Sequence, residues 1–379
     1  MKYVKYLFCG IFFSLLFFFF ITTINNNEEI SELEKRTLQT FPKFSLAAVS
    51  DGTYMENLTT AFSDQLELRD VLIKGYYIFQ FQRYSGDVVI GDNDELYAAY
   101  QRVSDMEKTK ENMRSAAKSI NKVSSEIDVP FIFLSIPRKD AVETENLPDN
   151  YISSDEIYTE SLNTIQENLN ENVYLIDAYE IFMNDNHQNR YYYMTDHHIT
   201  PAGAELLYKE ILNVIDNPQI PLFDLSKYEV GETLINGSFN NQIGQRIKPV
   251  PEELYILPKF DLDYVRYENE ELSDLTVYAE ANTYEDAYME GDFAYTIIDT
   301  DRPELPNILY VGSSFTNILE AMSVPSFNKM VSIDYRHNES GNSIQYYVEK
   351  HDIDYVVFVP SQSNNALSKS NIKEHLGLK

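Results

Sequence analysis

Cysteine and basic residues are the scarce components of this chain. Its 379 residues include a single cysteine, so an internal disulfide cannot form and a cysteine-rich zinc module is excluded. Six histidines leave little room for metal clusters. Lysine and arginine number 30 against 60 acidic side chains, which gives a formal net charge of -30. Such a charge repels phosphate backbones, so the composition argues against a nucleic-acid partner.

Apolar and aromatic side chains are plentiful. They make up 44% of the chain and include 29 tyrosines and 22 phenylalanines. This composition excludes a disordered acidic tail and provides enough material for a sizeable core. The length fits one large domain or two smaller ones.

The longest apolar run lies near the N-terminus, from Tyr6 to Ile24, and follows Lys2 and Lys5. It has about the length needed to cross a bilayer as a helix. Because no small-x-small cleavage site follows the run, we predict an uncleaved, single-pass anchor rather than a removed signal peptide. The cationic side stays in the cytoplasm, so residues 1–5 form a cytoplasmic tail and the main domain lies outside the cell.

The remainder of the chain has two regions that differ in their pattern of apolar and polar residues. Residues 25–90 form a membrane-proximal region, in which 55–81 have helical spacing. Residues 91–379 alternate short apolar strands with helices, which predicts an α/β domain with a doubly wound, mostly parallel sheet. An insertion at about 222–300, rich in Tyr, Asp and Glu, interrupts this rhythm. The expected strands are Val88–Ile90, Val129–Ile136, Val173–Ile176, Ile308–Val311, Met330–Ile333 and Asp354–Val359, and the clearest helices are Lys108–Ile127, Pro201–Val214 and Asn317–Met322.

The first candidate site is the triplet Asp196, His197 and His198, which lies just before the helix expected to begin at Pro201. A carboxylate beside an imidazole orients the ring and stabilises its protonated form, as a general base requires. Two other interpretations remain open, namely a cap for the coming helix and a metal site. We disfavour metal because neighbouring histidines point apart and no further ligands are close in sequence.

The second candidate site is Ser314, in the Gly-Ser-Ser-Phe sequence where a predicted strand turns into a predicted helix. A serine at such a turn lifts its hydroxyl to the carboxyl edge of the sheet, where backbone N–H groups face an oxyanion. The alternative is that Ser313 and Ser314 simply cap the helix. In a doubly wound sheet, both candidate sites lie at the ligand-binding edge.

Several blocks of the sequence together resemble a known family. The stretch TDHHITPAGA, residues 195–204, resembles the signature of the DHHW family of bacterial surface proteins, usually Asp-His-His-Trp-Thr. Weaker blocks follow the family's order around Ile136-Pro137-Arg138-Lys139, Asn236-Gly237-Ser238-Phe239, Gly312-Ser313-Ser314-Phe315 and Asp334-Tyr335-Arg336. The DHHW family is similar to the alginate O-acetyltransferase group, whose fold is SGNH hydrolase-like. The resemblance covers most of residues 30–360.

Carried over by position, the resemblance makes Asp196 the orienting acid, His198 the base and Ser314 the nucleophile. It implies an extracytoplasmic serine O-acetyltransferase or esterase that acts on a surface polysaccharide, with a membrane-bound O-acyltransferase as a candidate acyl supplier. No cofactor or metal is implied. The acid excess favours a neutral or zwitterionic glycan over a polyanionic one.

Two departures from the family pattern keep other functions open. Ile199 replaces the usual Trp, an aromatic wall that could pack the site, and Ser313 replaces an Asp. A non-catalytic glycan-binding or assembly scaffold with the same fold is therefore an alternative, as is an acyl-handling subunit for D-alanine on teichoic acid. We expect Arg336 to form an ion pair and Lys139 to be a surface charge.

Overall fold

The computed structural model describes residues 2–31, 36–73, 75, 88–99, 105–149, 151–185, 189–223, 229–242, 252–258, 260–360 and 368–378. The chain forms two compact units. The N-terminal unit comprises Met1–Asp87 and Asn240–Pro249, and the main unit comprises Val88–Phe239 and Val250–Lys379. Each unit is described by itself.

The N-terminal unit begins with the long helix α1 (Lys2–Asn25). Its 20-residue stretch Tyr6–Asn25 is long and apolar enough to cross a membrane. Two short helices and a small hairpin follow, namely α2 (Leu46–Ser50), α3 (Thr53–Asp64), β1 (Ile30–Ser31) and β2 (Arg36–Thr37). The buried Gln65 side chain ties the unit together, because it accepts from the Glu28 amide at 2.9 Å and donates to the Glu28 carbonyl at 2.8 Å. Of the helix expected at 55–81, α3 covers the start, and 76–81 lie outside the described residues.

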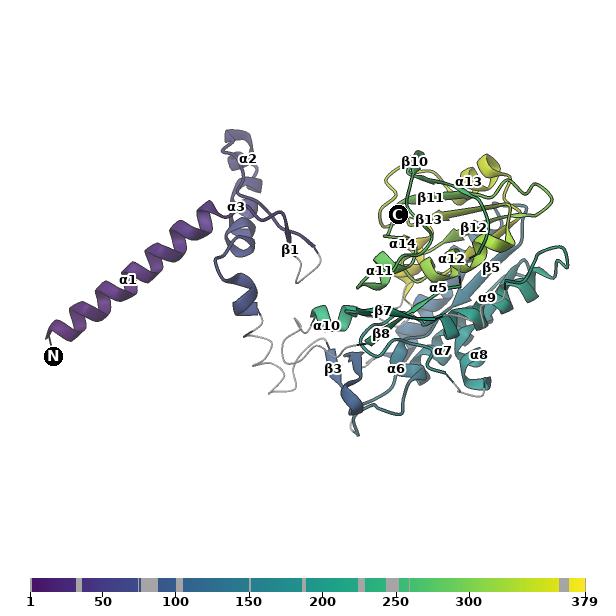
Figure 1. The fold of residues 1–379 in the computed structure, drawn as a ribbon, viewed down its shortest axis with the longest axis horizontal. Helices are drawn as coiled ribbons and strands as arrows, with labels where there is room; N and C mark the ends of the chain where they lie inside the picture. The colour runs from purple at the N-terminus through teal and green to yellow at the C-terminus, as the bar shows by residue number, and fades with distance from the viewer. Residues whose placement is uncertain are drawn as a thin grey trace. The chain divides into compact units, whose positions relative to one another are not determined.

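An eight-stranded sheet forms the centre of the main unit (Figure 1). Its strand order is β10-β9-β11-β13-β12-β14-β5-β6. The five strands from β13 to β6 run parallel to one another, and β11, β9 and β10 continue the sheet in antiparallel pairing. The prediction of a mostly parallel sheet is thus confirmed. The strands are β5 (Phe131–Ser135), β6 (Val173–Asp177), β9 (Val265–Glu268), β10 (Glu271–Ser273), β11 (Tyr295–Asp299), β12 (Asn307–Val311), β13 (Lys329–Ile333) and β14 (Tyr355–Phe358).

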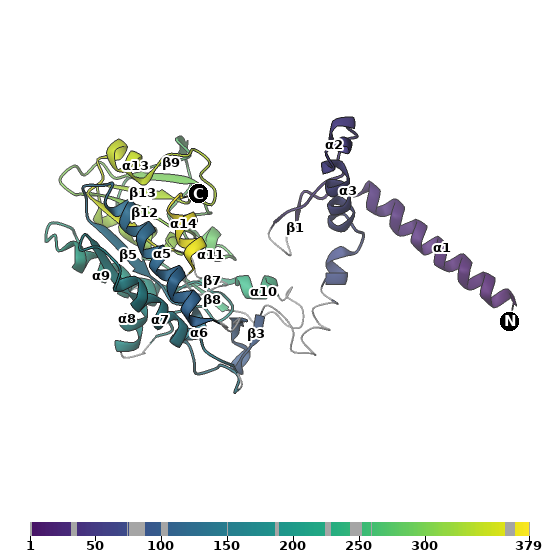
Figure 2. The same ribbon diagram turned by 180° about the vertical axis from the view of Figure 1, so that it is seen from behind.

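Helices cover both faces of this sheet (Figures 1 and 2). Successive side chains of a strand point to opposite faces, so Phe131 and Phe133 of β5 join one apolar core while Ile132 and Leu134 join the other. The first core is completed by α5 (Met106–Ser124), α7 (Asp155–Gln166), α13 (Ile344–His351) and α14 (Lys369–His375). The second is completed by α6 (Lys139–Val142), α8 (Ala178–Asn184), α9 (Pro201–Ile215), α11 (Tyr284–Ala287), α12 (Asn317–Ser323) and the 3-10 turn η2 (Val324–Ser326).

Two hairpins lie outside the large sheet. One joins β3 (Val88–Ile90) to β4 (Leu96–Ala98) through the turn η1 (Asp92–Asp94), and the other pairs β7 (Glu229–Ile235) with β8 (Glu252–Ile256). The short helix α10 (Ser238–Gln242) follows β7. The segment expected to be an insertion therefore supplies a hairpin and also the three antiparallel strands β9, β10 and β11 of the main sheet.

Candidate active site

Asp196, His198 and Ser314 lie in one chain of hydrogen bonds. The His198 Nε2 atom is 2.9 Å from the Ser314 Oγ atom, and the His198 Nδ1 atom is 2.7 Å from an Asp196 carboxylate oxygen. The other Asp196 oxygen accepts from the Ser238 amide at 2.6 Å. Ser314 retains 8% exposure while His198 is fully buried. These are the distances at which a serine hydroxyl can pass its proton to an imidazole held by a carboxylate.

The loop that carries Asp196, His197 and His198, called the histidine loop, is held by backbone pairing between the residues that precede it and those that follow it. Tyr192 forms an isolated antiparallel bridge with Ile199, and the Tyr193 amide donates to the His198 carbonyl at 3.2 Å. Thr200 is the N-cap of α9 and accepts from the Gly203 amide at 3.4 Å. Because Thr200 provides this cap, the Asp196 carboxylate is left to bind His198 and Ser238.

The loop that carries Ser313 and Ser314, called the serine loop, follows β12 at the carboxyl edge of the sheet. A side chain at Gly312 would come within 2.6 Å of Thr316 and 2.7 Å of the Val359 carbonyl, so only glycine fits this close turn. The N-cap of α12 is Thr316, so the serine pair precedes the helix and does not cap it. Among the described residues, no acceptor pairs with the Ser314 amide, which leaves it available to donate to an oxyanion.

Electrostatics favour a basic His198. Burial alone would lower the pKa of its imidazole, but the Asp196 carboxylate outweighs burial and raises that pKa. Burial would likewise raise the pKa of Asp196, yet the two neighbouring imidazoles hold it well below its usual range. Asp196 therefore stays ionised at neutral pH, and its charge favours the protonated form of the His198 ring.

His197 lies beside this arrangement. Its Nδ1 atom is 2.7 Å from the Ser238 hydroxyl, and burial followed by repulsion from His198 lowers the pKa of its ring to about 3. The ligand atoms of Asp196, His197 and His198 lie within 4.8 Å of one another, a spacing that could hold a metal ion. Both His198 nitrogens are already hydrogen-bonded, so a metal there would break the contact to Ser314 or to Asp196.

Aromatic rings from distant segments enclose the His198 imidazole. Tyr284 of α11 stacks on it at a centroid distance of 3.9 Å and an interplanar angle of 1°, and Phe315 lies at 4.9 Å. Ile199 has the position of the family's Trp, but it is fully buried in the core. Ile199 therefore does not form an aromatic wall of the site, and Tyr284 packs against the His198 ring instead.

Lys139 is buried, which corrects the expectation of a surface charge. Its ammonium lies 3.1 Å from a Glu95 carboxylate oxygen and donates to the carbonyls of Leu96 at 2.8 Å and Met194 at 2.6 Å. Glu252 of β8 accepts from the Thr195 amide and hydroxyl, at 2.8 and 2.7 Å. Lys139 and Glu252 therefore fix the two residues that precede Asp196.

Arg336 forms the ion pair that its sequence neighbourhood predicts. Its Nε atom donates to both carboxylate oxygens of Asp334 at 3.0 Å, and its Nη2 atom lies 3.7 Å from Asp292. The hydroxyl of Ser313, the second departure from the family pattern, is buried without a hydrogen-bond partner among the described residues. Ser313 therefore does not supply the interaction that an aspartate would make there.

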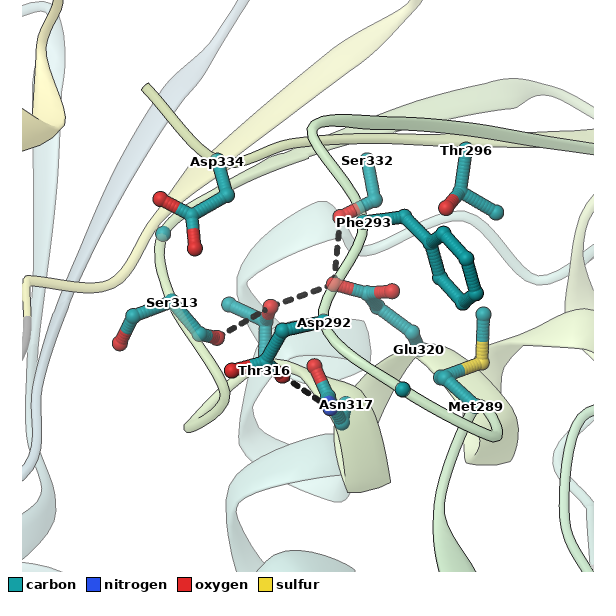
Figure 3. A pocket seen from close by; sticks show the side chains of 12 residues that line it. Met289, Asp292, Phe293, Thr296, Ser313, Thr316, Asn317, Glu320, Ser332 and Asp334 are labelled. Carbon is teal, nitrogen blue, oxygen red and sulfur yellow. Dashed lines mark hydrogen bonds between the residues drawn. The ribbon is translucent and has the colours of Figure 1, made fainter. Parts of the chain in front are cut away.

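A small polar cavity lies directly behind the serine loop (Figure 3). Its volume of about 10 Å³ is room for one water molecule. Glu320 of α12 points into it and accepts from the Ser332 hydroxyl at 2.6 Å and from the Thr316 hydroxyl, while Asn317 donates to Asp292 at 2.9 Å. Burial, only partly offset by these hydroxyl bonds, raises the pKa of Glu320 to about 7.

Glu320 should make the stability of the main unit fall as the pH rises from 4.5 to about 7. The folded protein holds this proton more tightly than the unfolded chain, because the pKa rises from 4.5 to about 7 on folding. The free energy of unfolding should therefore decline by about 3 kcal/mol between pH 4.5 and 7. Glu320→Gln has no titrating carboxyl at this position, so this pH-dependent contribution to stability is absent. The melting temperature of the variant, relative to that of the wild type at the same pH, should therefore increase as the pH rises. Parallel melting curves at pH 5, 6, 7 and 8 that keep a constant difference would contradict the assignment.

Sequence reasoning missed Ser238, Tyr284 and Glu252 as parts of the site. Ser238 lies in the Asn-Gly-Ser stretch noted as family-like, which is the only signal that pointed to it. Gly237 beside it approaches the Thr195 carbonyl so closely that a side chain would come within 2.2 Å. Tyr284 and Glu252 lie in the segment interpreted as an insertion, and only the tertiary fold shows that they reach the histidine loop.

Comparisons with known proteins agree with this architecture. A family model described as an SGNH hydrolase-like domain of the acetyltransferase AlgX matches residues 88–257. A DHHW family protein from Eubacterium siraeum superposes with a TM-score of 0.58 and 19% identity, over 77% of this chain and 95% of that one. PatB1 of Bacillus cereus superposes with a TM-score of 0.59 and 22% identity, over 76% of this chain and 97% of that one. No curated protein matches the sequence. The main unit therefore has the SGNH hydrolase-like fold.

Proposed function

We propose that this chain is a serine O-acetyltransferase or acetylesterase that acts on a polysaccharide, with Ser314 as nucleophile, His198 as general base and Asp196 as orienting acid. One observation carries the proposal, namely the continuous hydrogen-bonded path from the Ser314 Oγ atom through His198 to Asp196. The matching family model is that of an acetyltransferase domain, which supports acetyl as the transferred group.

The chemistry follows from the three side chains. The Ser314 Oγ atom attacks the carbonyl carbon of an acetyl ester while its proton moves to the His198 Nε2 atom. The oxyanion that forms is stabilised by the Ser314 amide. The imidazolium then protonates the leaving alcohol, and an acetyl-serine remains. A sugar hydroxyl, or water in an esterase, attacks this ester with loss of its proton to His198, and Ser314 recovers its hydroxyl hydrogen.

The apolar helix α1 supports a location at the membrane. We infer that Tyr6–Asn25 spans the cell membrane once, with the N-terminus in the cytoplasm and the main unit outside. In that arrangement the acetyl donor must come from across or within the membrane. A membrane-bound O-acyltransferase would supply it, and an exported glycan would receive it.

Covalent labelling tests the proposed nucleophile directly. The full chain in neutral detergent is treated with an alkyl fluorophosphonate and digested, and mass spectrometry then locates the adduct. We expect one adduct on Ser314 and a large loss of labelling in His198→Ala, because the base that activates the hydroxyl is gone. A PatB1 structure carries a sulfonyl adduct, so a sulfonyl fluoride is a useful second probe.

Two results would contradict the proposal. Labelling that persists at Ser314 in His198→Ala would separate the serine from its base, and an adduct elsewhere would reassign the nucleophile. Ser313→Ala is the matched control, because it removes the neighbouring hydroxyl that has no described partner and should label like the wild type.

With a chromogenic acetyl ester and cellohexaose as acceptor, acetylated sugar indicates transfer and free acetate alone indicates hydrolysis.

A further inference from the structure

The N-terminal unit has an apolar surface just after α3. Its side chains are those of Leu68, Val71 and Leu72, which are 52%, 62% and 55% exposed. The Leu72 amide donates to the Leu68 carbonyl at 2.9 Å, so residues 68–72 form one helical turn, called here the apolar turn. Residues three and four positions apart on a helix are neighbours, so the three side chains share one face. Apolar side chains gathered on one face, unlike scattered ones, indicate an interaction surface.

The charged residues of the apolar turn lie away from this face. Successive residues of a helix are rotated by about 100°, which directs Arg69 and Asp70 to the other side of the turn. There the Arg69 Nη1 atom lies 3.2 Å from an Asp70 carboxylate oxygen. The apolar turn therefore has an apolar side and a charged side, the division that is typical of a helix lying at a membrane interface.

The apolar turn begins beside the last turns of α1. The ring of Phe62 in α3 stacks on that of Phe20 in α1 at a centroid distance of 6.1 Å. The Glu67 amide donates to the Thr23 hydroxyl of α1 at 3.3 Å, and Leu68 follows directly. Figure 1 shows α3 beside the C-terminal end of α1. These contacts fix the start of the apolar turn against the end of the apolar helix.

The length of the apolar helix gives the depth of these contacts in a bilayer. The stretch Tyr6–Asn25 has 20 residues, which rise about 30 Å and match the thickness of the hydrocarbon core. Phe20 therefore lies about 7 Å inside the end of the span, and Thr23 about 3 Å inside it. A segment packed against both residues lies at the boundary between headgroups and acyl chains, where interfacial helices bury their apolar faces.

Lipid is the occupant that this position favours. If α1 spans the bilayer, acyl chains and glycerol groups surround its last turns, and they are the first apolar material that the apolar turn meets. A protein partner would have to displace them. The net charge of -30 opposes electrostatic attraction to anionic headgroups, so apolar contact is the interaction available to hold this unit at the membrane.

We propose that the apolar turn is a second membrane contact, in which Leu68, Val71 and Leu72 enter the bilayer leaflet at the C-terminal end of α1. The inference rests on the membrane span proposed for α1 and does not depend on the proposed acetyl transfer. The N-terminal unit would then be held at two points, so it could not rotate freely about the axis of α1.

Tryptophan fluorescence tests this contact, because the chain has no tryptophan of its own. The full-length Leu68→Trp variant is placed in phosphatidylcholine nanodiscs, a single chain per disc, with lipids brominated either near the headgroup or near the acyl terminus. We expect emission that is blue-shifted from that of N-acetyltryptophanamide in buffer. Bromine quenches tryptophan at close range, so the emission should fall more with the shallow bromines than with the deep ones.

Leu272→Trp is the matched control. Leu272 is 71% exposed on β10, where it follows Glu271, and a tryptophan there has the same intrinsic preference for interfaces. This control should show neither the blue shift nor the loss of emission. Adding Leu72→Asp and Val71→Asp to Leu68→Trp should abolish both effects, because a carboxylate is costly to bury in the apolar boundary. Circular dichroism verifies that each variant is folded.

Each remaining outcome counts against the proposal in a different way. Emission of Leu68→Trp at the wavelength of the free indole in buffer would overturn it. A blue shift without bromine quenching would assign the apolar turn to a protein surface, and quenching that survives both aspartates would assign the effect to the tryptophan itself.

Leu15→Trp separates this inference from the membrane span on which it rests. Leu15 lies near the middle of Tyr6–Asn25, so its tryptophan should lose more emission with the deep bromines. If Leu15→Trp is quenched and Leu68→Trp is not, only the second contact is overturned. If Leu15→Trp is not quenched either, the proposed span is overturned with it.

Discussion

Replacing Ser314 with alanine is expected to lower the turnover of a chromogenic acetyl ester by about 10⁴-fold or more. The variant keeps the Ser314 amide and the aromatic enclosure of His198, but it has no atom that can form the acyl-enzyme. The remaining rate should reflect binding and oxyanion stabilisation alone. The measurement is the initial rate for the full chain in detergent, corrected for spontaneous hydrolysis of the ester.

The same mechanism predicts a specific pattern among combined variants. The turnover of His198→Ala should fall by a similar factor. The turnover of the double variant Ser314→Ala/His198→Ala should fall no further than that of either single variant, because the effects of replacing residues that act as one unit are not additive. Ser313→Ala provides the control, since its hydroxyl has no described partner, and its rate should stay within about twofold of the wild type. Turnover that survives in Ser314→Ala would eliminate this serine as nucleophile, whereas a wild type without turnover would favour the scaffold alternative.

The second large effect concerns stability. Lys139→Met should destabilise the main unit by about 3 to 5 kcal/mol, because it removes the buried cation that pairs with Glu95 and leaves Arg190, at the edge of the cluster, as its remaining partner. Glu95 is 1% exposed, and burial would raise the pKa of its carboxyl but the Lys139 and Arg190 charges hold it below its usual value. The carbonyls of Leu96 and Met194 also lose their donor. A fall in melting temperature of about 10 °C is the expected observation.

A surface lysine gives the comparison for this variant. Lys209 pairs with Glu205 one turn away, but its side chain is 44% exposed. Lys209→Met should therefore shift the melting temperature by no more than about 2 °C. If Lys139→Met and Lys209→Met melted alike, the buried ion cluster would contribute nothing to stability, and the rigidity of the loop before Asp196 would need another explanation.

The parallel half of the sheet could be predicted from the sequence because its strands are buried on both faces. Residues 131–134 and 308–311 read as unbroken apolar runs, and each run is followed by a turn that the sequence also indicates. The histidine and serine loops could be found for the same reason, since they follow predicted strands or precede a predicted helix. Sequence pattern alone also places both loops at one edge of the sheet.

The antiparallel half and the surroundings of the base could not be predicted in this way. The strands β9 and β10 contain Glu268 and Glu271 rather than an apolar run; β9 pairs with the edge of β11, and β10 pairs with β9. Lys139 is typical of a surface position until the fold brings Glu95 within 3.1 Å of it. Tyr284 stacks on a histidine 86 positions earlier, a contact that no local pattern encodes.

The strand order has a consequence for the time course of synthesis. β5 and β6 are made early, but β5 joins the remainder of the sheet only through β14, which is the last strand to be made. Ser314 itself follows His198 by 116 positions. A ribosome therefore delivers the helix α1 first and the partner strand of β5 almost last. The nascent chain would be tethered to the membrane, under the proposed topology, long before it could carry out any chemistry, so a prematurely terminated product would be an inert membrane protein rather than an unregulated esterase.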